Sequence, residues 1–579
     1  MLRSGRNLAF AMLLFESLAG CKPFIWERED RRLVDPGVAI GESALARSAA
    51  YRDTIGARAY YEGMRPLRVR GYGLVVGLGK NGSRDCPQAV FEGLVQTMHK
   101  QRHTTGRVVG VEQLTPEQLI VDEDTAVVVV QGDIPPAALR GTTFDVTVRA
   151  LPGTRTESLR GGRLYTSELR VFKPGSQGRA IAGRVLARAS GPVFMNPFSG
   201  DRAATKSSPL YGTVVGGGAV TESRRVRLVL FEASHRWARR IQDRINDYVP
   251  GAERVADAIS PSFVNVRIPE AYRGDEGHFL ALIRHLYLSQ DPQLQAARAR
   301  ALAEEVVAPG APHARIALAF EGLGQVALPV LGKLYSHPRD YVSFHAAVAG
   351  LRLGDYIAGD AIALCARNEL SPFRFPAIRA LSAARDVGGT GVVLRDLLND
   401  ADPRVRVAAY EALTARRDST IRSIRVGGDN FILDEVPTSR PPSIYAKRSG
   451  ARRLALFGGE LSCTPPVLYR SEDGTLTITA GTNATELTLL RVVLPSGTSS
   501  PPIPAPFNLR DLVILLGTKA GVDLSGRVTG LGLDYGAVVA ALYHLSQQGS
   551  LNAEFVLEQP NAAELFGPPT PPGRPESEL

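Results

Sequence analysis

The chain has 579 residues, of which 44% are hydrophobic and 22% charged, so it is long enough for three or four folded domains and too apolar to be disordered throughout. Its net charge of +10 comes from cationic residues spread over the whole length, not gathered on one helix or loop. This distribution argues against nucleic-acid binding and makes anionic lipid headgroups or cell-wall polymer the more natural partners.

The first twenty residues predict an export signal. Arg3 and Arg6 provide a basic start, residues 8–15 form an apolar run too short to span a bilayer, and a Leu-Ala-Gly-Cys cleavage site follows. The pattern predicts cleavage after Gly20 and lipid attachment to Cys21, the alternative being an ordinary cleaved signal with a chance cysteine. The next residue is lysine, not the aspartate that retains lipoproteins at the inner membrane, which favours the outer membrane.

Residues 21–50 are charged and irregular and are predicted to be a tether, so the folded body begins near residue 51. Between 51 and 290 the sequence alternates mainly as strands do, with helical patterns at 87–101 and 234–249. Within 125–149 two strand patterns flank a Pro-Pro turn, and apolar and polar residues alternate in the second of them. This region therefore predicts a β-rich domain with a few helices.

A glycine-rich stretch, residues 70–82, is predicted to be a strand punctuated by turns. It does not fit the dinucleotide-binding G-x-G-x-x-G pattern, because three residues instead of two separate Gly73 from Gly77. Pro87 also interrupts the chain before a helix is established. The acidic residues 122–124, just before a strand, could hold a cation, but a turn explains them better.

The predicted helix over 234–249 has an apolar stripe at every fourth residue and an otherwise basic surface. The basic side chains are Arg236, Arg239, Arg240 and Arg244. This face could hold an anionic polymer or the acidic edge of a neighbouring subunit. The alternative is a solvated face, which is the usual state of a charged helix surface.

Between 291 and 420 the strand patterns stop and short helices rich in alanine and leucine follow one another. Four of them open with a polar residue before a proline, and the prolines at 338, 372 and 403 lie 34 and 31 residues apart. Residues 402–413 resemble a HEAT-type repeat helix. Such repeats stack into a curved slab that usually binds protein.

Residues 421–445 are predicted to be a connector, 446–560 a second region of strands and helices, and 561–579 a proline-rich tail. The sequence lacks the G-x-S-x-G and H-E-x-x-H motifs, and its nine histidines are scattered. No catalytic, cofactor-binding or metal-binding residues are therefore predicted.

Three cysteines remain besides Cys21, and none forms a C-x-x-C pair or stands near a ligand-spaced histidine. Cys365 is predicted to be a small apolar residue of a helix. A bridge between Cys86 and Cys463 stays open at this point.

Four stretches resemble, in order, segments of the flagellar P-ring protein family: "GYGLVVGLGKNGSRD" near residue 71, the strands of 125–149, "SLRGGRLYTSELR" from residue 158, and the helix and strand of 531–558. The residues that carry the two most distinctive matches are Gly71, Tyr72, Gly73, Leu74, Val75, Gly77 and Leu78, and Ser158, Leu159, Arg160, Gly161 and Gly162. Typical members lack the helices of 291–420, which therefore look like an insertion. The Arg-Thr-Gly stretch expected near 448–456 appears only as "KRSGARRLALFGG", a departure that could mean rebuilt ring contacts.

The resemblance implies an α+β fold, with β-rich P-ring-like domains interrupted by an all-α HEAT-like solenoid. The flanking regions would fold back into one subunit while the helical block bulges outward. It further implies a non-enzymatic subunit of a periplasmic ring around the flagellar rod, held at the outer membrane by lipid and meeting the rod and the L-ring. Alternatives are a non-flagellar envelope scaffold lipoprotein that binds a protein partner through its repeats, or an envelope hydrolase, which would need a cleft with paired acids or a metal.

Overall fold

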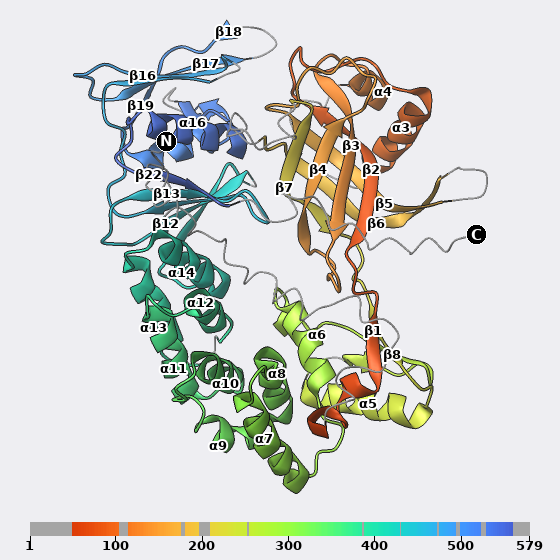
Figure 1. Cartoon of the computed structure of the whole chain (residues 1–579). Coiled ribbons are helices and arrows are strands. Elements are labelled where there is room, and N and C mark those ends of the chain that lie inside the picture. The colour runs from red at the N-terminus through yellow and green to blue at the C-terminus, as the bar shows by residue number, and fades with distance from the viewer. Residues whose placement is uncertain are drawn as a thin grey trace, which may run out of the picture.

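The computed structural model describes most of the chain between residues 49 and 559 (Figure 1). Within that span it leaves out 103–113, 175–179, 196–208, 250, 252–253, 385–386, 429, 472–473, 494–497 and 523–527. Four parts follow one another: a small α/β unit, a closed barrel inserted into it, a helical block, and a C-terminal module of two sheets and two helices. The mixed α+β fold with a helical block is confirmed.

The small unit is built around a four-stranded antiparallel sheet with the order β1-β8-β10-β9. The strands are β1 (Ala59–Glu62), β8 (Val226–Leu230), β9 (Ala256–Asp257) and β10 (Phe263–Val266). Helices α5 (His235–Tyr248) and α6 (Glu276–His285) contribute apolar side chains to the same core. Because β1 and β8 are neighbours in the sheet, the whole barrel is an insertion between two paired strands.

The barrel closes in the order β2-β3-β4-β7-β6-β5. Its strands are β2 (Leu67–Val76), β3 (Thr125–Ile134), β4 (Thr143–Ala150), β5 (Arg163–Pro174), β6 (Ala180–Pro192) and β7 (Tyr211–Val220). The alternation predicted on β4 is confirmed, since Phe144, Val146 and Val148 are all buried in the barrel core. Helices α3 (Gln88–Arg102) and α4 (Pro116–Ile120) pack on the outside of β2 and β3.

The side chain of Arg224 fastens the barrel to the small unit. Its guanidinium donates to the carbonyl oxygens of Ile134 (3.1 Å) and Pro135 (2.8 Å) at the end of β3. It also donates to the carbonyl oxygens of Gly63 and Arg65, at 3.0 Å each, on the segment that enters the barrel. Burial lowers the pKa of Arg224, but four carbonyl acceptors compensate for the lost water. Arg224 lies on the segment that leaves the barrel for β8, so its side chain binds this segment to the one that enters the barrel from β1.

The helical block contains α7 (Pro292–Val307), α8 (His313–Leu323), α9 (Leu328–Leu331), α10 (Asp340–Arg352), α11 (Tyr356–Arg367), α12 (Arg374–Ala383), α13 (Thr390–Asp396) and α14 (Pro403–Arg416). Asp291 and Asp402 accept hydrogen bonds from the first backbone N–H groups of α7 and α14, with proline at the first helical position. At α10 and α12 the proline instead lies just before the helix. The HEAT-type classification stays a prediction.

One stretch of the helical block, His313–Leu331, has the length and apolarity of a membrane span. Its residues Ile316, Ala319 and Phe320 are buried among the neighbouring helices. The apolar composition is therefore explained by the core of the block.

The helical block is packed at both ends, which corrects the expectation that it bulges from the rest. At its start, Tyr51 and Tyr287 of the small unit belong to its hydrophobic core. At its end, the same core continues into Val436, Ala455 and Phe457 of the C-terminal module. Figure 1 shows the block running from the small unit to the C-terminal module, which lies beside the barrel. The block is thus a brace between two parts of the molecule.

The C-terminal module has two sheets. The first has the order β11-β12-β14-β13-β22, from β11 (Arg422–Val426), β12 (Phe431–Val436), β13 (Ser443–Ala446), β14 (Arg453–Phe457) and β22 (Glu554–Leu557). The second contains β15 (Val467–Arg470), β16 (Leu476–Ala480), β17 (Leu487–Val493), β18 (Thr498–Ser499) and β19 (Ile503–Ala505). Helices α15 (Leu509–Gly517) and α16 (Tyr535–Gln547) complete the core, beside the short pair β20 (Gly521–Val522) and β21 (Val528–Gly530). Residues 421–445, expected to be a connector, instead supply three strands of the first sheet.

A buried polar network joins α14 to this first sheet. The carboxylate of Asp434, which is fully buried, accepts hydrogen bonds from Tyr410 (2.6 Å) and Ser423 (2.5 Å). Arg453 donates two further bonds to it, at 2.8 and 2.9 Å. Burial and the nearby carboxylate raise the pKa of Tyr410, so its hydroxyl remains a donor. The charge is therefore paired and fully hydrogen-bonded.

We expect Gly71→Ala to destabilise the barrel by about 1–3 kcal/mol, because the added Cβ would collide with the carbonyl oxygen of Glu168 on β5. Gly93→Ala is the matched control, since a Cβ at Gly93 in α3 meets no atom within 4 Å and alanine favours a helix by about 1 kcal/mol. Calorimetry, with hydrogen exchange of β2 and β5, measures both. Equal melting temperatures would contradict the prediction.

We expect Asp434→Ala to cost about 3–5 kcal/mol, because it leaves the Arg453 guanidinium without its partner in the interior. Tyr410→Phe removes one hydrogen bond to the carboxylate and should cost about 1.5–3 kcal/mol. Glu460→Ala, at an exposed carboxylate of the same module, is the control. Urea unfolding should rank the three in that order, and an Asp434→Ala variant as stable as the control would rule out the role of the network.

Candidate functional site

The two signature stretches of the sequence meet inside the barrel. Gly162, in the turn before β5, lies against the side chains of Val75 and Leu78, and a Cβ at Gly162 would collide with both. Where β2 pairs with β5, a Cβ at Gly73 would collide with the hydroxyl of Ser167 on β5. Leu159 is fully buried in the same core. These residues let two backbones approach closely, so the inward-facing part of the signature builds the barrel core.

The turn after β2 is held by Asp124. Its carboxylate accepts from the backbone N–H groups of Gly77 (3.2 Å) and Gly79 (2.6 Å), while its own N–H donates to the Asp122 carboxylate at 2.8 Å. Glu123 pairs with Arg84 at 3.3 Å. Burial raises the pKa of Asp124, and the two backbone bonds oppose that shift. The three acidic residues thus form a turn, as predicted, and the described part of the chain holds no cluster suited to a metal ion.

The outer residues of the two signature stretches face solvent. Tyr72 is 46% exposed on β2. In the turn before β5, the Ser158 hydroxyl accepts from the backbone N–H of Arg160 at 3.1 Å, and Gly161 has the positive φ of 71° that suits glycine. Leu74, on the face of β2 opposite Val75, packs under α3.

The basic helix α5 is only partly a free surface. Arg236 and Arg239 are exposed, and Arg240 lies over the Trp237 ring at 4.9 Å. Arg244 turns inward and donates to the carbonyl oxygens of Tyr287 (2.8 Å) and Gly322 (3.3 Å). Burial lowers its pKa. The expectation that all four arginines form one face is therefore wrong for Arg244, which connects the small unit to the helical block.

The three described cysteines are free thiols, so no bridge joins Cys86 to Cys463. Cys365 lies in α11, as predicted. Burial raises the pKa of Cys463 to about 12, which makes this thiol unreactive at neutral pH. Gly20 and Cys21, the predicted cleavage and lipidation positions, lie outside the described residues.

A carboxylate missed by the sequence analysis joins the barrel to the C-terminal module. Asp145 on β4 accepts from the backbone N–H of Gly216 on β7 at 2.6 Å and from that of Gly450 at 3.1 Å. Phe194 and Val215 of the barrel extend this contact into the core of the C-terminal module. Asp145 looks like any polar position of an alternating strand, and its partner lies 305 residues away. No local signal could have revealed it.

The loop that receives Asp145 belongs to the segment that departs from the family pattern. The Glu558 carboxylate accepts from the backbone N–H groups of Arg448 (2.7 Å) and Ser449 (2.9 Å) and from the Ser449 hydroxyl (2.9 Å). Tyr535 donates its hydroxyl to the carbonyl oxygen of Lys447 at 2.6 Å. The altered segment is therefore an ordered contact within the subunit.

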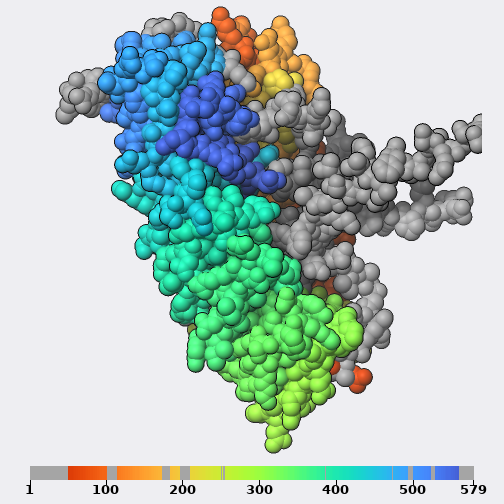
Figure 2. All heavy atoms as spheres, turned by 60° about the vertical axis from the view of Figure 1, so that its left-hand side comes forward, coloured from red at the N-terminus to blue at the C-terminus, as the bar shows by residue number. Residues whose placement is uncertain are grey.

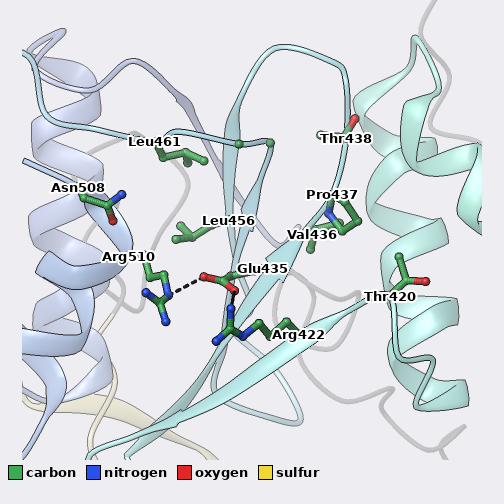
Figure 3. Close-up of a pocket in the computed structure, with 12 residues that line it drawn as sticks. Thr420, Arg422, Glu435, Val436, Pro437, Thr438, Leu456, Leu461, Asn508 and Arg510 are labelled. Carbon is green, nitrogen blue, oxygen red and sulfur yellow. Dashed lines mark ion pairs between the residues drawn. The ribbon is translucent and has the colours of Figure 1, made fainter.

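A cleft of about 550 Å³ opens where α15 meets the first C-terminal sheet (Figure 3). Glu435 lies between Arg510 (2.6 Å) and Arg422 (3.5 Å), so the charged groups pair with each other. The apolar lining residues include Val436, Leu456 and Leu461, and the lining lacks histidine, cysteine and serine. Glu435 is the one acidic residue of this lining, so the cleft does not contain paired acids.

The comparisons with known proteins match the part of the chain that carries the two signature stretches. The family model described as flagellar P-ring protein matches residues 55–298, which cover most of the small unit and the whole barrel. Flagellar P-ring proteins of Geobacter metallireducens and of a Bradyrhizobium strain are 32% and 31% identical, over 40% and 45% of this chain.

These matches cover 60% and 65% of the two relatives, so the chain spans somewhat less than two thirds of their length. The matched region ends at residue 298, within α7, the first helix of the helical block. Over residues 55–298, the chain is similar to the flagellar P-ring protein family.

Proposed function

We propose that this protein is a non-enzymatic structural subunit of a periplasmic ring of the flagellar basal body. The carrying observation is the family match over residues 55–298, supported by four parts packed into one body. A bushing around a rotating rod must resist shear, and a closed barrel braced by helices suits that demand. The partners would be further copies of the chain, the rod and the L-ring.

The export signal supports a location in the periplasm at the outer membrane. Acylation of Cys21 would hold each subunit at the membrane through buried acyl chains, each CH₂ contributing about 0.8 kcal/mol. The tether of residues 21–50 would then separate the lipid from the folded body.

A second candidate function is a non-flagellar envelope scaffold that binds a protein partner through the helical block. The observation that favours it is the group of large apolar side chains exposed on that block, among them Tyr356, Leu364 and Leu370. The block lies almost wholly beyond the part of the chain that matches the family.

Deleting the gene in the native organism should abolish swimming, and imaged basal bodies should lack the ring. Restoring the full gene is the control for secondary effects of the deletion. Wild-type basal bodies without this protein, or normal swimming after deletion, would refute the flagellar function and favour the scaffold.

We expect Cys21→Ser to abolish incorporation of labelled palmitate and to move the protein from the outer-membrane fraction to the soluble periplasmic fraction. Cys86→Ser is the matched control, because Cys86 lies in the folded body and should leave fractionation unchanged. A Cys21→Ser protein that still incorporates the label would show that the anchor is elsewhere.

A further inference from the structure

The outer surface of α11 carries apolar side chains that are half or more exposed to solvent. Tyr356, Ile357 and Leu364 are 71%, 51% and 69% exposed, and Leu370, just beyond the helix, is 93% exposed. The opposite side of α11 is the buried one, with Ala358, Ile362, Ala363 and Ala366 in the core of the block. Single exposed apolar residues are ordinary, but a concentration on one helix surface marks an interaction site.

Two carboxylates accompany these apolar side chains, beside Arg367, whose guanidinium pairs with Asp396 at 2.9 Å. Asp360 lies one turn from both Tyr356 and Leu364, and Glu369 precedes Leu370. Both are exposed, and within the described ranges neither takes part in an ion pair or a side-chain hydrogen bond. We call this surface the α11 face, defined by Tyr356, Ile357, Asp360, Leu364, Glu369 and Leu370.

A surface that is basic on balance lies on the small unit, although the exposed Asp243 stands on the same side of α5 as its arginines. Arg236 and Arg239 of α5 are exposed and have no side-chain partner among the residues that the structure describes. Two exposed apolar residues flank them: Phe231, 41% exposed before α5, and Ile259, 60% exposed. Ile259 follows Ala258, whose backbone N–H donates to Gln242 of α5 at 2.9 Å. We call this surface the α5 face, defined by Phe231, Arg236, Arg239 and Ile259.

The two helices that carry these faces, α11 and α5, lie on opposite sides of the molecule. In Figure 1, α11 is on the outer left of the helical block, whereas α5 is at the lower right, in the small unit. Figure 2 turns the left side forward and shows the helical block, in green, uncovered by the other described parts. A contact between these faces within one copy is therefore impossible.

We propose that the α11 face of one copy docks on the α5 face of the next copy. Apolar side chains meet apolar side chains, and two carboxylates meet two guanidinium groups, which gives both burial and charge complementarity. Because the faces differ and their helices lie on opposite sides, the contact is head-to-tail and each copy binds two neighbours. This inference rests on the proposed ring function and assigns its subunit contact to the helical block and α5.

The test reverses the charges on each face. In the full purified chain, Asp360→Arg with Glu369→Arg, or Arg236→Glu with Arg239→Glu, should weaken self-association at least about tenfold, because like charges then face each other. Combining all four substitutions in one chain should restore assembly. Sedimentation velocity at low and high salt measures this, and Leu364→Ser probes the apolar part without changing charge.

The control reverses exposed charges elsewhere, with Arg163→Glu on the barrel and Glu460→Arg on the C-terminal module, and should leave assembly unchanged. If the wild-type chain assembles and either reversed face assembles equally well, the α11–α5 contact is wrong and the ring function stands. Failure of the combined variant to recover also overturns the pairing. A wild-type chain that stays monomeric at every concentration overturns the ring function and this contact together.

Discussion

The structure depends on the continuous core that joins the helical block to its neighbours at both ends. Tyr287 of the small unit and Phe457 of the C-terminal module belong to one hydrophobic cluster, so the block fixes where the C-terminal module stands. The contact of Asp145 with Gly450 then forms between parts already held in place. The chain loses little further conformational entropy when such an intramolecular contact forms, so a few hydrogen bonds are enough to stabilise it. With this contact, the four parts of the molecule form a ring of successive interfaces.

The polar groups inside these junctions fix the relative orientation of the parts more than they raise the free energy of unfolding. Hydrophobic contacts tolerate sliding, whereas the Asp434 carboxylate has one arrangement that satisfies Tyr410, Ser423 and Arg453 together. Replacing such a buried pair with apolar residues can be neutral for stability, so its value here is the single orientation of α14 on the sheet. The four carbonyl bonds of Arg224 have the same effect between barrel and small unit.

Local patterns were sufficient wherever local physics decides the structure. The apolar alternation of β4 and the aspartate–proline starts of α7 and α14 are as predicted, because pleating and helix capping act over a few residues. The strands of 421–445 were missed because proline and polar residues obscure a sheet whose partners β14 and β22 come later in the chain. The inward turn of Arg244 could not be predicted either, since its acceptors, Tyr287 and Gly322, lie on other elements.

The insertion of the barrel between two paired strands has a consequence for the order of folding. The barrel is one uninterrupted stretch of chain, so it can form from its own hairpins before the strands on either side of it meet. Once it has closed, Glu62 of β1 and Arg227 of β8 are brought together as register partners. The closed barrel holds its two ends near each other, so little further loop entropy is lost when β1 and β8 pair. The small sheet can therefore form after the barrel.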